Sequence, residues 1–274
     1  MTNDSLRWRA AALATLAFAL IAGAARAAVP ATVQLERLTW TELRERIAAG
    51  ATTALLPIGG VEQSGPHMAL GKHDVRVRSL ATEIADKLGN AIVAPVLAYV
   101  PEGSIDPPTQ HMRFPGTISV PVPAFEAVLE GAARSLCHAG FRDVVFLGDH
   151  GGYQTSLKRV AARLDHGRGP RCRVIALTEY YEAAQQPFTR ILLAHGIRAD
   201  EVGAHAGVAD TSLMLAVDPT MVRMDVAAAR KPGTQGDGVS GDPRRSSAAL
   251  GRLGVEHIVA VSVAAIRERV AAPH

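Results

Sequence analysis

The side chains best suited to chemistry lie in two glycine-rich loops, each directly after an apolar run typical of a buried strand. The first loop follows residues 54–58 and supplies two imidazoles and two carboxylates within thirteen residues: Glu62, His67, His73 and Asp74. The second follows residues 143–147 and carries Asp149 and His150 before two glycines. Ligands in α/β folds bind beyond the carboxyl ends of the strands, and imidazoles and carboxylates bind metals and carry protons. The two loops therefore predict a metal or catalytic site at one end of a sheet.

The metal ligands that we predict are Glu62, His73, Asp74 and His150. An acidic residue in a glycine-flanked turn is suited to be an anionic ligand or a general base. Asp74 has an alternative role as the N-cap of the next helix, and His150 could instead be a capping or core histidine at a strand end. Whether His73 or Asp74 is the ligand stays open. Zinc is the metal we expect first, although manganese and iron accept the same ligands.

Two further segments carry candidate catalytic or substrate-binding residues. His205 and Asp210 lie in residues 203–212, where small neighbours would allow close approach of substrate or backbone. We expect His205 to act as an acid/base or to bind substrate, and the alternative for Asp210 is a helix cap. His111 lies in a loop over 101–117 that is rich in proline and glycine, where it could contact substrate or simply bond to backbone.

The elements that must position these residues alternate along the chain. The apolar runs predict strands at 53–58, 91–97, 143–147 and 173–178. Helical periodicity and capping signals predict helices at 39–50, 75–88, 125–136, 153–164 and 248–270. Residues 229–247 lack periodicity and are expected to form a mobile loop. Apolar strands separated by amphipathic helices predict a three-layer αβα fold with a mainly parallel central sheet.

The first 27 residues have the pattern of a cleaved export signal. Arg7 and Arg9 precede an apolar run over 10–24, and Ala25-Arg26-Ala27 fits a cleavage site with small residues. The alternative is an uncleaved anchor, but the run is shorter than the roughly 20 apolar residues of a membrane-spanning helix. We therefore expect a periplasmic or secreted protein without a stable membrane anchor, and a single domain over 28–274.

The net charge bears on the expected binding partners, and the cysteine content bears on disulfide formation. The formal net charge of +3 falls to +1 without the leader, which gives no reason to expect a nucleic acid as partner. Cys137 and Cys172 are the two cysteines of the chain. In an oxidising compartment they could pair, and the alternative is two buried thiols.

Four motifs, in order, resemble those of the creatininase (creatinine amidohydrolase) family. They are Glu62-Gln63-Ser64-Gly65-Pro66-His67, Phe114-Pro115-Gly116-Thr117, Gly148-Asp149-His150-Gly151-Gly152-Tyr153 and His205-Ala206-Gly207-Val208-Ala209-Asp210-Thr211-Ser212. The resemblance spans about residues 35–225. It implies a layered α/β fold, a homo-oligomer and a metal-dependent hydrolase that cleaves an amide-type C–N bond. It also implies two divalent ions that share an Asp, with Glu62 and His150 at ligand positions of the first.

This chain departs from the family pattern at ligand positions. Ser64 stands where the family has a histidine that binds the second ion, and a hydroxyl is a poor substitute for an imidazole. The shared Asp falls on His73 without a gap and on Asp74 with one inserted residue. Asp210 replaces a longer Glu. The number of ions, one or two, is therefore left open, and one ion held by Glu62, His73 and His150 would retain an open position for water.

The leading hypothesis is an exported, metal-dependent amidohydrolase acting on a small-molecule substrate. The metal would polarise a carbonyl and activate water, with catalytic roles for His205 and Asp210. The side chains expected to contact substrate are His67, His111, Ser64 and Tyr153. The alternative is a creatininase-like protein that binds a metal or small molecule without hydrolysis. A serine hydrolase built on Ser64 and His67 is disfavoured because the chain lacks a Gly-x-Ser-x-Gly elbow there.

Overall fold

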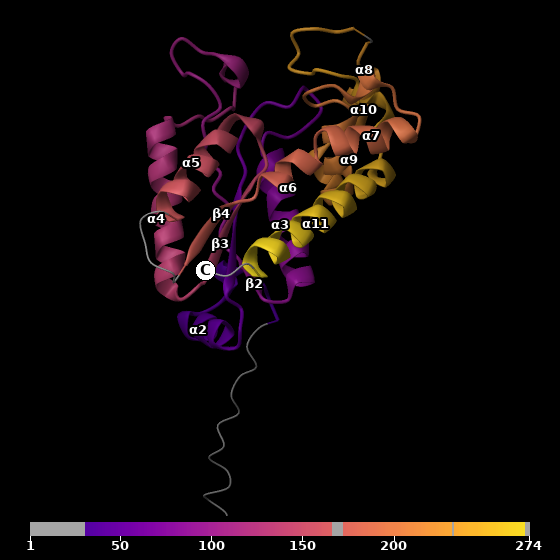
Figure 1. Cartoon of the computed structure of the whole chain (residues 1–274). Coiled ribbons are helices and arrows are strands. Elements are labelled where there is room, and N and C mark those ends of the chain that lie inside the picture. The colour runs from indigo at the N-terminus through magenta and orange to yellow at the C-terminus, as the bar shows by residue number, and fades with distance from the viewer. Residues whose placement is uncertain (1–30, 166–171, 232, 272–274) are drawn as a thin grey trace, which may run out of the picture. The chain divides into compact units, whose positions relative to one another are not determined.

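The structure is a computed structural model that describes residues 31–165, 172–231 and 233–271 (Figure 1). The predicted export signal at 1–27 lies outside the described residues. Thr32–His274 forms one compact unit.

A parallel sheet forms the centre of this unit, as the apolar runs predicted. Its strands are β1 (Thr53–Ile58), β2 (Ala91–Val93), β3 (Asp143–Gly148) and β4 (Arg173–Ala176), in the order β2-β1-β3-β4. Thr53 pairs with Ala91 on one side and with Asp143 on the other, and every ladder is parallel. The second strand is shorter than the predicted 91–97. Ala94 still donates to the carbonyl of Leu55, but the next donor to β1 is Leu97, three residues on, so the regular ladder ends. Only an isolated bridge from Leu97 to Ile58 continues the pairing.

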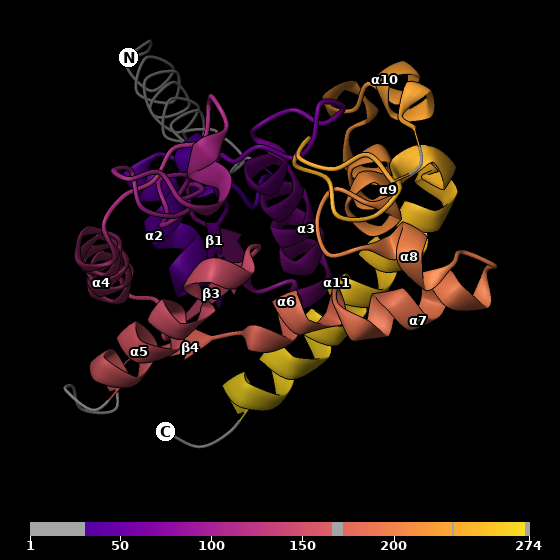
Figure 2. The same cartoon turned by 90° about the horizontal axis from the view of Figure 1, so that it is seen from above.

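Helices cover both faces of the sheet (Figures 1 and 2). One face carries α2 (Trp40–Ala48), α4 (Val122–Ala139) and α5 (Gln154–Asp165), and the other carries α3 (Lys72–Leu88), α6 (Thr178–Ala183), α9 (Val208–Val217) and α11 (Ala248–Ala271). The other α-helices of the described residues are α7 (Gln186–Ala194), α8 (Ala199–Val202) and α10 (Met224–Ala229). Short 3-10 turns are η1 (Leu35–Arg37), η2 (Gln110–Arg113), η3 (Gly151–Tyr153), η4 (Pro219–Met221) and η5 (Pro243–Arg245). The predicted three-layer αβα architecture is confirmed.

Alternate strand residues supply the two cores. Leu55 and Val145 pack on the side of α3 and α11, whereas Leu56 and Phe146 pack on the side of α4 and α5. Successive side chains of a strand point to opposite faces, so a run that is apolar throughout can bury both faces of the sheet.

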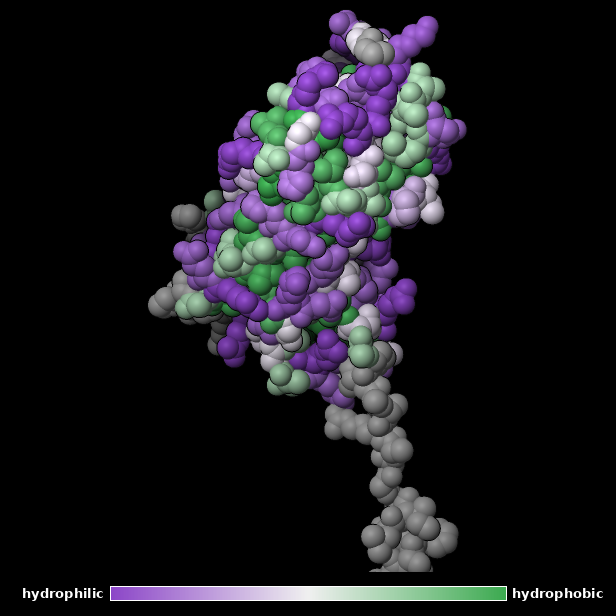
Figure 3. All heavy atoms as spheres, turned by 90° about the vertical axis from the view of Figure 1, so that its right-hand side faces the viewer, coloured by the Kyte–Doolittle hydropathy of each residue, from purple (hydrophilic) through white to green (hydrophobic). Residues whose placement is uncertain are grey.

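Helix α11 is long and apolar enough, by length and composition, to cross a membrane, yet one side of it is part of the core. An added Cβ at Gly251 would lie 1.8 Å from the carbonyl oxygen of Ser212 in α9, so glycine allows the two helices to approach closely. On the face that forms the right-hand side of Figure 1, apolar patches lie among hydrophilic residues (Figure 3). These contacts are those of a core helix in a globular domain.

Cys137 and Cys172 form a disulfide, which settles the alternative that the sequence left open. The bond joins the end of α4 to the residue before β4, across 35 positions of the chain. A cross-link of this span restricts the unfolded chain and so stabilises the folded one.

Removal of this disulfide should lower the free energy of unfolding by about 3 to 4 kcal/mol, the value expected for closing a loop of this length. Denaturant unfolding of the oxidised wild type, the reduced wild type and the Cys137→Ser/Cys172→Ser variant measures it. The reduced protein and the double variant should agree, and reducing agent should not change the double variant. Equal stability of the oxidised protein and the double variant would contradict a stabilising bond.

Candidate active site and metal centre

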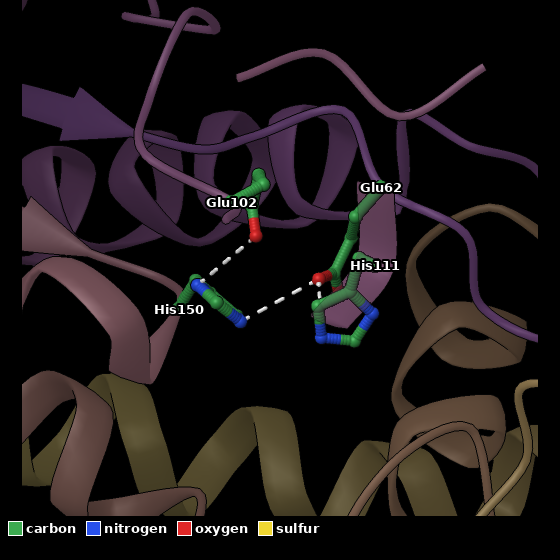
Figure 4. Close-up of side chains that lie close together, drawn as sticks. All are labelled: Glu62, Glu102, His111 and His150. Atoms are coloured by element: carbon green, nitrogen blue, oxygen red, sulfur yellow. Dashed lines mark ion pairs between the residues drawn. The ribbon is translucent and has the colours of Figure 1, made fainter. Parts of the chain in front are cut away.

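Four side chains converge beyond the carboxyl ends of three adjacent strands. Glu62 follows β1, Glu102 follows β2, and His150 follows β3, while His111 comes from η2 in the loop after β2. Because the strands are parallel, these loops meet at one edge of the sheet. One potential ligand atom from each of the four side chains lies within 4.8 Å of all the others, and Figure 4 shows them facing a common point. We call these four residues the ligand cluster.

Three of the four carboxylate oxygens in the ligand cluster make no hydrogen bond within the described chain. Glu62 Oε2 lies 3.3 Å from His111 Nε2 and 3.5 Å from His150 Nε2, while Glu102 Oε2 lies 3.5 Å from His150 Nδ1. Glu62 Oε2 and both oxygens of Glu102 are buried and make no hydrogen bond within the described chain. Buried polar atoms without partners are costly. A divalent cation bound by two carboxylates and two imidazoles would remove that cost, so the cluster fits one such ion.

Burial sets the protonation of the cluster. It lowers the pKa of His150 to about 3, helped by the positive charge of His73, and it lowers the pKa of His111 as well. Both imidazoles are therefore neutral at pH 7, the form that binds metals. Burial and the negative charge of Glu62 raise the pKa of Glu102 to about 9, so this carboxyl holds a proton until a cation displaces it.

Gln63 orients two of the imidazoles. Its side-chain Nε2 lies 2.9 Å from His111 Nδ1, and its backbone carbonyl accepts a hydrogen bond of 2.9 Å from His205 Nε2. The amide is itself fixed, since its Oε1 accepts from the N–H of Gly65 at 3.0 Å. His205 donates from its second ring nitrogen to a carbonyl, which is the usual way in which a catalytic histidine is held in place. His111 differs, because the Gln63 amide donates to Nδ1 and leaves the ring proton on Nε2, which faces Glu62.

A buried network of charges lies behind Glu62. His73 bridges two carboxylates, with Nε2 2.8 Å from Glu62 Oε1 and Nδ1 2.5 Å from Asp149 Oδ2. Burial and the charge of Lys72 act to lower the pKa of His73, but Glu62 and the hydrogen bonds to both carboxylates outweigh them and raise it. Arg76 binds Asp149 and Asp210. Both ring nitrogens of His73 are thus engaged, and the residue holds Glu62 from the side opposite the ligand cluster.

The other predicted residues occupy different positions. Asp74 accepts a hydrogen bond of 2.9 Å from the N–H of Gly60, at the turn that follows β1. His67 is buried, with Nε2 2.9 Å from Thr211 Oγ1, and the buried Ser64 hydroxyl has no partner within the described chain. Tyr153 donates to the carbonyls of Ile58 and Gly59 and accepts from the N–H groups of Asp149 and His150, so it ties the end of β1 to that of β3.

The structure therefore brings Glu62, His111 and His150 together and places His205 beside them, with Nδ1 3.8 Å from Glu62 Oε1. Asp74, His67, Ser64 and Tyr153 are not members of the ligand cluster. The roles predicted for these residues stay predictions. Sequence reasoning missed Glu102, although an acidic residue in the loop after a predicted strand was the signal that identified Glu62.

A cavity of about 210 Å³ opens beside the ligand cluster. Its wall includes His111, His150, His205, Lys72, Asp210 and Tyr181. Tyr181 projects from α6, and its hydroxyl would lie 2.5 Å from a Cβ added at Gly151, which places it over the loop of His150. A second, wider hollow of about 610 Å³ shares His111 and His205 and is also lined by Phe114 and Val239. A small molecule in either space would reach the same two imidazoles.

A layered α/β domain with carboxylates and imidazoles gathered beyond the strand ends has the features of an α/β enzyme with a candidate metal site. The profile described as creatinine amidohydrolase matches residues 36–266. The chain therefore belongs to the creatininase family and is a hydrolase of the amidohydrolase type.

Individual relatives agree with this assignment. Creatinine amidohydrolase of Pseudomonas putida is 29% identical over 209 residues, which cover 74% of this chain and 78% of the relative. A mycofactocin precursor peptide peptidase of Mycolicibacterium smegmatis is 29% identical over 176 residues, 62% of this chain and 60% of the relative. A tryptophan-to-alanine variant of creatininase superposes with a TM-score of 0.73 at 26% identity, covering 88% of this chain and 100% of that structure.

Substitution of a ligand should abolish metal binding without unfolding the protein. We expect His150→Ala to lower the affinity for Zn²⁺ by at least about 100-fold, because one of four donors is lost. Elemental analysis after dialysis should find near-stoichiometric zinc in the wild type and near none in the variant. His138→Ala, which changes an exposed histidine of α4, is the matched control and should retain its zinc. Equal zinc in the His150 and His138 variants would contradict the assignment.

Metal binding at about pH 7 should release one proton per ion, from Glu102. The pKa of this carboxyl is about 9, so it is protonated at neutral pH, and the affinity should rise with pH until it ionises. Calorimetric titration with Mn²⁺ in buffers of different ionisation enthalpy measures the release. Glu102→Gln should bind more weakly and release no proton, whereas unchanged release from this variant would exclude Glu102 as its source.

Proposed function

We propose that this chain hydrolyses an amide-type C–N bond of a small molecule, cyclic or linear, at a divalent metal ion held by the ligand cluster. The observation that carries the proposal is the set of buried carboxylate oxygens without donors, opposite neutral imidazoles and beside a cavity. Zinc is the ion we propose, and manganese or iron would suit the same donors. Related creatininase structures described as the Zn-Zn type and as the Mn form support this choice.

The reaction proposed requires a polarised carbonyl, a water nucleophile and a proton carrier. A divalent ion at the cluster supplies Lewis-acid polarisation and lowers the pKa of water. His205 is the proposed proton carrier, because its Nε2 is bonded to the carbonyl of Gln63 and its Nδ1 is left to accept a proton. Burial and the charge of Lys72 lower the pKa of His205 to about 4, so the ring is neutral at pH 7, the protonation state in which it can accept a proton.

Asp210 supports His205 instead of reacting itself. Its Oδ2 accepts a hydrogen bond of 2.9 Å from the N–H of Ala206, the residue after His205. Lys72 and Arg76 outweigh burial and hold the pKa of Asp210 well below its usual range, so it stays ionised. The Tyr181 hydroxyl lines the cavity and makes no hydrogen bond to another described residue, so it is available to donate one to substrate.

The substrate class follows from the relatives and the dimensions of the cavity. The names of the Pseudomonas and Mycolicibacterium relatives describe an amidohydrolase and a peptidase, and both activities cleave amide-type bonds. One creatininase structure is described as complexed with creatine. A cavity of about 210 Å³ suits a compact amide of this size, and the adjoining hollow could accept a longer one.

We also propose that the protein is exported, to the periplasm or the outside, and forms a homo-oligomer. The disulfide supports an oxidising compartment. Large apolar side chains exposed near the loop after β2, Tyr99, Ile105, Ile118 and Val122, support a contact between copies of the chain.

The function is tested by a panel of cyclic and linear amides, creatinine included, incubated with protein loaded with Zn²⁺ or Mn²⁺. We expect turnover of at least one compound. His205→Ala should lower kcat by about 100-fold or more, the usual worth of a general base, with its bound metal unchanged. His195→Ala, which changes an exposed histidine, should match the wild type. No turnover across the panel, or full activity of the His205 variant, would contradict the proposal.

A further inference from the structure

A buried lysine lies beside the ligand cluster. Lys72 is 0% exposed, and its Nζ lies 3.3 Å from Glu62 Oε1 and 3.3 Å from Asp210 Oδ2. Lysines are almost never fully buried unless they are paired. The two carboxylates come from separate segments, the loop after β1 and helix α9. The ammonium group therefore bridges two anions as a bound cation would.

Glu62 divides its two oxygens between two kinds of cation. Oε1 faces Lys72 and His73, whereas Oε2 faces His111 and His150 and makes no hydrogen bond within the described chain. A second metal ion on the Oε1 side would lie close to the ammonium group and be repelled by it. The geometry therefore leaves room for one ion, at Oε2.

The position of this charge in its helix is unfavourable by itself. Lys72, His73 and Arg76 all lie in the first turns of α3. The N-terminus of a helix carries a partial positive charge, which disfavours a cation there. The carboxylates of Glu62 and Asp210 offset this cost, so the cations stabilise the charged site and not the helix.

We propose that the centre is a hybrid, with one metal ion at the ligand cluster and the Lys72 ammonium group as its second, fixed cation. This inference rests on the proposed function. An ammonium group has three N–H donors. Lys72 donates one hydrogen bond to Asp210 and pairs by charge with Glu62, and its charge would stabilise the oxygen that becomes negative as an amide carbonyl is attacked. One related creatininase is described as the Zn-Zn type, so this chain would replace an ion with a side chain.

The first test is the number of ions in the full-length wild type. Equilibrium dialysis against saturating Mn²⁺, followed by elemental analysis, should give one ion per chain. Two ions per chain would overturn the inference while leaving the proposed hydrolase intact. No bound ion would overturn the proposed function, and the inference with it.

The second test removes the ammonium group. Lys72→Met should bind Mn²⁺ about tenfold or more tightly, because a like charge beside the ligand Glu62 is lost. Its kcat should fall by about 100-fold or more on any amide that the wild type cleaves. Lys87→Met makes the same substitution at an exposed position of the same helix and should change neither value. A purely structural lysine predicts the opposite for the metal, since a misplaced Glu62 would bind it more weakly, and that result would overturn the inference.

Lys72→Arg covers the case in which the methionine variant fails to fold, as judged by circular dichroism. Arginine keeps the positive charge but presents its donors in a different geometry. This variant should still bind a single Mn²⁺ ion and should have a lower kcat. Two ions in Lys72→Arg, or wild-type kcat, would overturn the inference.

Discussion

The Glu62 carboxylate is the point on which the whole site depends. It is fully buried. Lys72 and His73 contact its Oε1, and the imidazole of His205 lies further away on the same side. Burial opposes its charge, but Lys72 and His73 outweigh that effect and hold its pKa well below the usual range. Glu62 is consequently a permanent anion whose second oxygen is available to a cation. The neighbouring Glu102, lacking such partners, is instead protonated.

The fold produces this arrangement through its strand order. With β1 at the centre between β2 and β3, the loops that follow these three strands are neighbours, and each supplies a member of the ligand cluster. Helix α3 begins directly after the first loop, so its first turn brings Lys72 and His73 under Glu62. Tyr153 joins the backbones of β1 and β3 at their ends, which fixes the distance between Glu62 and His150. The site is therefore rigid because the edge of the sheet is rigid.

Much of this fold could be predicted from the sequence, because continuous apolar runs and helical periodicity reflect burial directly. The strands at 53–58 and 143–147 and the last helix were predicted within a residue or two. The short helices between 178 and 229 were harder to predict from the sequence, since a helix of few turns shows little periodicity. Four site residues could be predicted because each lies beside glycines or in a loop rich in proline and glycine: Glu62, His111, His150 and His205. Glu102 was missed although it lies in the loop after a predicted strand, as Glu62 does. Lys72 was missed because its importance comes from partners distant in the chain, which spacing alone does not reveal.

The most direct test of a metal centre at Glu62, Glu102, His111 and His150 is diffraction from Zn²⁺-soaked crystals, with anomalous data at the zinc absorption edge. The predicted result is one anomalous peak per chain, with oxygens of both glutamates and nitrogens of both histidines at about 2.0 to 2.2 Å, the usual Zn–N and Zn–O distances. No peak at this edge of the sheet, or an ion bound by His73 and Asp74 without Glu102 and His111, would contradict it.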